Sequence, residues 1–278
     1  MFTSISKILL DYSKSDISSE SSQKQLLGFT VKASIIVQII TGVITLGAIF
    51  FKLAPKDMIL HDIILMETIV QFVELAFYIF ISYYLVKISV SGVTPLRYFD
   101  WVFTTPTMLL STIMFFDYKN KQKEAPDDKD KSKGLKEPMS TINDKSKELK
   151  EPKTGLRFTE FVKENKATVL RMFAYNFLML MFGYLGETGR INLYMANIIG
   201  FVFFGLTFYT IWSNYVKGYT ALINHQLFYF MLIVWALYGI TALMSPLLKN
   251  IGYNFLDIIA KNFYGLFIFY QIYLTRIQ

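Results

Sequence analysis

Seven apolar stretches, each long enough to cross a bilayer, dominate this sequence of 278 residues. A helix needs about 20 mostly apolar residues to span the hydrocarbon core. A lipid-facing backbone must satisfy its own hydrogen bonds, and the alternating pattern of barrel strands is absent, so we expect helices. The sequence therefore predicts an all-α membrane protein, a bundle of seven transmembrane helices. The stretches comprise residues 31–53, 58–86, 98–116, 168–185, 193–216, 222–248 and 251–273.

Composition supports a membrane protein and excludes several other classes. Hydrophobic residues make up 53% of the chain and charged residues 18%, with a mean hydropathy of +0.38. A soluble domain would have about a quarter of its residues charged. The chain contains no cysteine and two histidines, so we expect neither disulfides nor a metal site.

The net charge of +7 does not indicate a nucleic-acid partner, because the basic residues are unevenly distributed. Half of the 28 lysines and arginines lie in residues 117–166, together with 11 acidic residues. Such a nearly balanced segment is typical of a solvated, lysine-rich loop, here between the third and fourth helices. Within it, residues 130–138 recur as 144–152, which favours a disordered linker over a segment that folds on a soluble partner.

The remaining polar segments concern the ends of the chain and its orientation in the membrane. Residues 1–30 form a polar N-terminal tail without a signal peptide, in which residues 5–10 are a candidate interfacial helix. More lysines and arginines fall in inner loops when the N-terminus is outside, so we predict a multi-pass protein with a cytoplasmic C-terminus. Residues 31–275 would then be the functional domain, surrounded by membrane lipids; a homo-oligomer is left open.

The seventh stretch contains an ion pair in an otherwise lipid-like context. Asp257 and Lys261 are four residues apart, which on a helix places both side chains on one face. An ionisable residue at membrane depth is costly and by default marks a functional site. The alternative is a buried pair that only fixes helix packing.

The third stretch adds a second set of charges. Arg97, Asp100, Thr104 and Ser111 fall on one helical stripe, next to a potential kink at Pro106. A lysine converted to a protonated imine would hold a fixed cation that needs counter-ions, and two aspartates, with Arg97 to keep them ionised, suit that need. The alternative is an internal salt bridge with a packing kink.

Aromatic residues could enclose a flat ligand beside these charges. Trp235 and Tyr238 are three residues apart on one face of the sixth helix, and Trp101 follows Asp100. Together they could clamp a long polyene. Aromatic residues at helical spacing usually just pack a core, so this pattern alone decides little.

These motifs resemble those of the microbial rhodopsins. The resemblance rests on Arg-Tyr-x-Asp-Trp-x-x-Thr-Thr-Pro in the third helix, Trp-x-x-Tyr in the sixth and Asp-x-x-x-Lys in the seventh. The fourth helix is similar to the proteorhodopsin pattern. The resemblance covers residues 31–275 without the lysine-rich loop, and it implies a retinal protein rather than an enzyme.

The resemblance also implies roles for individual residues. All-trans retinal would form a Schiff base with Lys261, with Asp100 as primary counter-ion and proton acceptor and Asp257 as the second. Arg97 would lie on the outer side, and Thr104 would hydrogen-bond Asp100. The chromophore would be lined by Trp101, Thr105, Met108, Trp235 and Tyr238.

Departures from the family pattern bear on the activity. Ser111 stands where proton pumps carry a carboxylic acid, and Gly239 where they usually carry a proline. Glu67, Gln71 and Glu74 form a polar stripe on the second helix, which resembles channelrhodopsins of the viral group; packing alone is the alternative. We expect a light-gated channel for monovalent cations or protons whose ion pathway includes the stripe and Ser111. The alternatives are a slow outward proton pump and a photosensor that signals through the inner loop.

Overall fold

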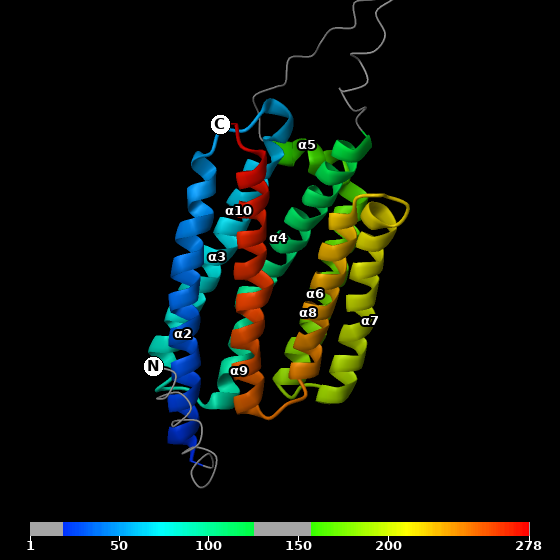
Figure 1. Cartoon of the computed structure of the whole chain (residues 1–278). Helices are drawn as coiled ribbons and strands as arrows, with labels where there is room; N and C mark the ends of the chain where they lie inside the picture. The colour runs from blue at the N-terminus through cyan, green and yellow to red at the C-terminus, as the bar shows by residue number, and fades with distance from the viewer. Residues whose placement is uncertain (1–18, 125–156, 278) are drawn as a thin grey trace, which may run out of the picture.

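The computed structural model describes residues 19–124 and 157–277, and these are almost entirely helical, with no strand. Figure 1 shows the long helices standing side by side. Six of them are individually long and apolar enough to cross a membrane. A seventh rod consists of α9 (Pro246–Asp257), the π-helix η5 (Ile258–Phe263) and α10 (Tyr264–Thr275) in line. The predicted seven-helix bundle is therefore confirmed. The other spans are α2 (Glu20–Gly47), α3 (Ile59–Tyr84), α4 (Val90–Glu124), α6 (Lys166–Glu187), α7 (Leu193–Ile211) and α8 (Leu222–Thr241).

Several helices begin or end away from the predicted apolar stretches. The first span starts at Glu20 rather than at 31, because Ser19 caps it by accepting a hydrogen bond from the Ser22 amide. The sixth span ends at Thr241, well before 248, and Pro246 opens the next helix, a position that favours proline. Hydropathy marks the lipid-facing part of a helix, and polar turns extend beyond it.

The predicted loop between the third and fourth spans is partly helical. α4 continues to Glu124, and a short helix, α5 (Arg157–Glu164), precedes α6. The Asp62 carboxylate of α3 accepts a hydrogen bond from the Phe158 amide at 3.0 Å, which attaches α5 to the bundle. The repeat in 130–138 and 144–152 and the candidate helix at 5–10 lie outside the described residues.

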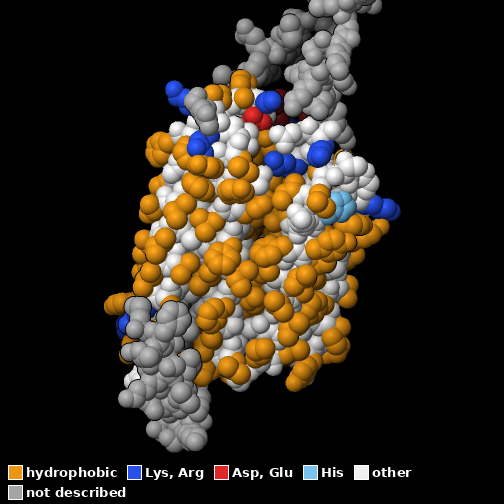
Figure 2. Space-filling view, viewed as in Figure 1, with side chains coloured by type: hydrophobic (Ala, Val, Ile, Leu, Met, Phe, Trp, Pro, Cys, Tyr) orange, Lys and Arg blue, Asp and Glu red, His pale blue; other side chains and the backbone are white. Residues whose placement is uncertain are grey.

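The surface is that of a membrane protein. Apolar side chains cover the middle of the bundle in Figure 2, and lysine and arginine side chains gather at the end where α5 lies. We call that end the inner end and the opposite one the outer end, after the predicted orientation. Buried polar side chains, in contrast, concentrate inside the bundle around the seventh rod.

Lys261 lies in η5, where the helix widens locally from the α to the π form. Such π-helical turns are rare and occur often at functional sites. The short 3-10 helices η1 (Ala48–Phe50) and η2 (Pro55–Asp57) and the π-helix η4 (Trp212–Val216) complete the described elements.

Candidate functional site

The amine of Lys261 lies among three carboxylates from three helices. Its Nζ is 2.6 Å from Asp100 on α4, 3.5 Å from Asp257 on α9 and 3.9 Å from Glu74 on α3. All four side chains are buried, at 2% exposure or less. The structure thus brings together the lysine and two aspartates that the motifs single out. Glu74, expected on an ion pathway, also belongs to this cluster.

Asp257 is held by a dense set of donors. Tyr78 and Tyr238 donate hydrogen bonds to its two oxygens at 2.7 and 2.8 Å. Arg97 donates to it at 3.3 Å. Charge-assisted bonds of this kind suit an ionised carboxylate.

Arg97 is itself fixed from the seventh rod. Its guanidinium donates to the side chains of Asn250 and Asn254 at 3.1 and 2.5 Å. We expected Arg97 to serve both aspartates, but among the described residues it forms an ion pair only with Asp257. The reason is positional, because these asparagines hold the guanidinium beside α9.

Asp100 makes fewer contacts than expected. One oxygen is bonded to Lys261, and the other, Oδ1, has no hydrogen-bond partner among the described residues. The predicted bond from Thr104 to this carboxylate is absent, because the Thr104 hydroxyl donates to the backbone carbonyl of Asp100 at 3.0 Å. A threonine four residues onward in a helix readily makes this local bond.

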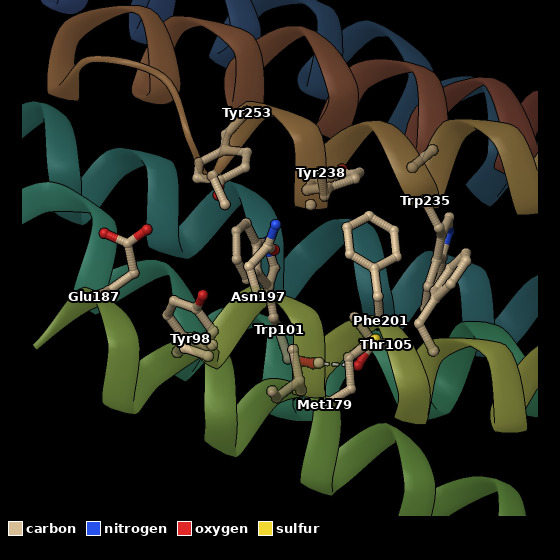
Figure 3. Close-up of a pocket in the computed structure, with 18 of the residues that line it drawn as sticks. Tyr98, Trp101, Thr105, Met179, Glu187, Asn197, Phe201, Trp235, Tyr238 and Tyr253 are labelled. Atoms are coloured by element: carbon tan, nitrogen blue, oxygen red, sulfur yellow. Dashed lines mark hydrogen bonds between the residues drawn. The ribbon is translucent and has the colours of Figure 1, made fainter. Parts of the chain in front are cut away.

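An apolar pocket opens beside Lys261 (Figure 3). It encloses about 870 Å³ of empty space, a volume that includes its open mouth. All five residues expected to line a chromophore are in its wall, namely Trp101, Thr105, Met108, Trp235 and Tyr238. Gly239 is also explained, since a Cβ there would lie 2.5 Å from the ring of Phe201, another lining residue.

The polar stripe on α3 faces the interior. Glu67, Gln71 and Glu74 are at most 3% exposed. The Ser111 hydroxyl on α4 donates a hydrogen bond to Glu67. The Thr45 hydroxyl on α2 donates to Gln71 at 3.0 Å. The stripe therefore packs against α2 and α4, and Gln71 also approaches Gly265 of α10.

Sequence reasoning missed the uncharged partners of this stripe. Gln38, Thr41 and Thr45 are buried on one face of α2, and Asn262, directly after Lys261, donates to Thr41 at 3.0 Å. Their spacing of three and four residues in an apolar stretch predicts a polar face on this helix. We call the whole group the polar seam: Gln38, Thr41, Thr45, Glu67, Gln71, Glu74 and Asn262.

A further buried ion pair lies at the outer end. Lys249 of α9 donates to both oxygens of Glu187, at the end of α6, at 2.7 and 3.0 Å. Both side chains are 7% exposed. Glu187 also lines the pocket, so this pair closes one side of it.

Comparison with known proteins now identifies the family. A family model described as bacteriorhodopsin-like protein matches residues 30–274. The chain belongs to this family. Its cofactor is retinal, the chromophore that the family binds, and the resemblance to microbial rhodopsins is confirmed. The site fits such a group, because a buried amine faces an apolar, aromatic pocket and has carboxylates beside it.

Solved structures agree with this assignment. The viral rhodopsin OLPVRII is 25% identical, with a TM-score of 0.69 over 90% of this chain and 98% of that one. A blue light-absorbing proteorhodopsin from Med12 is 15% identical, with a TM-score of 0.61 over 90% and 98%. Xanthorhodopsin, a light-driven ion pump with dual chromophore, is 15% identical, with a TM-score of 0.63 over 92% and 95%. A comparison with curated protein sequences found no match.

Proposed function

We propose that this protein is a light-gated cation channel in which retinal is attached to Lys261. Bound there, retinal supplies light absorption and isomerisation. The observation that supports a channel is the polar seam, which is buried inside the bundle, extends about 10 Å along α3 from Glu67, and reaches the lysine at Glu74.

The residues around Lys261 neutralise its positive charge and accept its proton. Asp100 is the nearest carboxylate, and its Oδ2 at 2.6 Å is the acceptor for a proton from the lysine nitrogen. Asp257, fixed by two phenols and Arg97, is the permanent counter-charge. Trp101 and Trp235 contribute aromatic walls to the pocket, which orient the ligand.

The polar seam requires partners beyond the protein side chains. Buried polar atoms in proteins are almost always hydrogen-bonded, and ordered water often supplies the bond. A group of such atoms that includes two glutamates is therefore suited to hold water and cations. Seven seam atoms lack a hydrogen-bond partner among the described residues: Gln38 Nε2 and Oε1, Glu67 Oε2, Gln71 Nε2, Glu74 Oε1 and Oε2, and Asn262 Oδ1.

One contact favours the second candidate, a light-driven outward proton pump. The absence of an acid at Ser111 argued against a pump, yet Ser111 donates directly to the carboxylate of Glu67 on the neighbouring helix. Glu67 is seven residues, or about 10 Å, from Glu74 along α3. An acid at this place could return a proton to the lysine nitrogen through the seam.

Voltage-clamped illumination of cells supplied with retinal distinguishes the two functions. A channel gives a photocurrent that reverses sign with voltage and follows the cation gradient. Current that is outward at every voltage would exclude the channel and favour the pump. Absence of current, with a downstream response that depends on residues 120–155, would instead favour a photosensor.

The variant Glu67→Gln sharpens this experiment. In a channel it should change the conductance or the reversal potential, whereas in a pump it should slow turnover without changing the direction of current. Glu160→Gln, on the exposed face of α5, is the matched control and should leave the current unchanged. An unchanged current in Glu67→Gln would mean that Glu67 serves packing only.

A further inference from the structure

The pocket beside Lys261 has two chemically different ends. In Figure 3, Trp235 and Thr105 line one end, and Glu187, Tyr98, Asn197 and Tyr253 lie toward the other. We call the latter four residues the polar end. They come from four helices, α6, α4, α7 and α9.

Helix geometry places the polar end on the outer side of the lysine. Tyr98 precedes Thr105 by seven residues on α4, and Tyr253 precedes Lys261 by eight on the seventh rod. Each offset corresponds to two turns along the helix backbone, or about 11 Å, but the amine itself reaches Asp100, two residues after Tyr98 on α4. Asn197 and Glu187 come from α7 and α6, across the pocket from the seventh rod. A ligand attached at Lys261 therefore meets them with its far end, and the far end of retinal is its ring.

Two groups of the polar end have no hydrogen-bond partner among the described residues. Neither the Tyr98 hydroxyl nor the Asn197 carboxamide makes a hydrogen bond within the part of the chain that the structure describes. Both are half-buried at the pocket wall. Glu187, oriented by Lys249, has further acceptor sites beyond that ion pair.

Small residues keep this end open. The Tyr98 hydroxyl lies 2.6 Å from where a Cβ of Gly183 would be, so only glycine allows the phenol to occupy this place. Ala196 and Ala242 also line the pocket with minimal side chains. Hydrogen-bonding groups and space therefore coincide, whereas the purely hydrocarbon ring of retinal would leave these groups unmatched.

We propose that the polar end recognises a hydroxyl group on the ring of the bound ligand, so that the pocket prefers a ring-hydroxylated retinal to retinal itself. Asn197 and Tyr98 donate hydrogen bonds to the ring hydroxyl oxygen, and the Glu187 carboxylate accepts a hydrogen bond from that hydroxyl. The inference rests on the attachment at Lys261 proposed above. A site that hydrogen-bonds a hydroxyl discriminates against the analogue lacking it, because its own polar groups are then left unpaired.

A competition experiment tests this preference. The retinal-free protein is incubated with equal amounts of all-trans retinal and all-trans 3-hydroxyretinal, and the bound ligand is extracted and quantified. One net hydrogen bond corresponds to a preference of about fivefold for the hydroxylated compound. Tyr98→Phe and Asn197→Leu should each reduce the ratio toward one while retinal itself still binds.

Tyr194→Phe is the matched control, because Tyr194 lies on α7 like Asn197 but is 64% exposed on the outside of the bundle. It should keep the full preference. Equal binding of the two compounds to the unmodified chain would overturn the inference while leaving retinal attachment intact, as would a preference that survives the Tyr98→Phe/Asn197→Leu double variant. If neither compound bound, the attachment at Lys261 would fail, and this inference with it.

Discussion

The carboxylate of Glu74 on α3 lies 3.9 Å from the amine of Lys261, on the seventh rod. The same carboxylate belongs to the polar seam, and neither of its oxygens has a hydrogen-bond partner among the described residues. The proposed site of the light-sensitive charge and the proposed ion route therefore share a residue. In the proposed channel, a change of charge at the lysine nitrogen would act on a seam carboxylate only 3.9 Å away.

Lys261→Ala should abolish the colour that forms when retinal is added, because the chain then lacks the only amine in the pocket wall. The absorption spectrum of the purified protein with retinal measures this. Lys217→Ala, an exposed position after η4, is the control and should colour normally. A Lys261→Ala protein as coloured as the unmodified one would contradict the proposed attachment.

Neutralising the three carboxylates should shift the absorption to the red in the order of their distances from Lys261. The shift should be largest for Asp100→Asn, at 2.6 Å, smaller for Asp257→Asn, at 3.5 Å, and smallest for Glu74→Gln, at 3.9 Å. A nearby anion stabilises the positive charge on the nitrogen before excitation, and its effect falls with distance. Asp100→Asn should also slow or abolish loss of the proton from the lysine nitrogen. A larger shift for Glu74→Gln would contradict Asp100 as the primary counter-ion.

Gly265→Ala should reduce the photocurrent. A Cβ at this position would lie 2.0 Å from Gln71 Nε2 and 3.2 Å from Thr45 Cγ2, so the Gln71 amide must move within the seam. Gly205→Ala on α7 is the control, because a Cβ there meets nothing within 4 Å. Alanine is the better helix former, so loss of helix propensity cannot explain a smaller current. Equal photocurrents in the two variants would show that the packing of the polar seam does not affect conduction.

Lys249→Met should destabilise the protein by about 3 kcal/mol or more, because it leaves the Glu187 carboxylate buried without its partner. The Glu187→Leu/Lys249→Met double variant should recover most of this loss, since an apolar pair has no desolvation cost. The temperature at which the bound pigment loses its colour measures the effect. If the single variant were as heat-resistant as the unmodified protein, the pair would contribute nothing to stability.

The sequence predicts much of the site, because the spacing of residues along one helix determines which of them share a face. Asp257 and Lys261 share a helix, and their spacing alone predicts a common face; the resemblance then pairs them with Asp100. Helix number follows equally well from the apolar stretches. The two ends of a span are less predictable, as Glu20 shows, because polar turns extend beyond the lipid.

Contacts between helices could not be read in the same way. The stripe on α3 indicates a buried face, but nothing in it tells which helix lies opposite, so Glu74 was expected on a pathway and not beside the lysine. Thr104 illustrates a different limit, since a backbone carbonyl within its own helix competes with the aspartate side chain. Gln38 carries no charge, so its presence in an apolar stretch is a weaker indication of a functional site than an ionisable residue at the same depth.

The π-helix η5 sets the rotational phase of the seventh rod. Its extra residue per turn lets Asp257, before it, face Tyr78 while Tyr264, after it, faces Thr112. Deleting one residue from Ile258–Phe263 would turn the two halves against each other by about 100°. One of these two anchorages would then be lost, so the number of residues in this segment determines which side chains on either side of the lysine face the interior of the bundle.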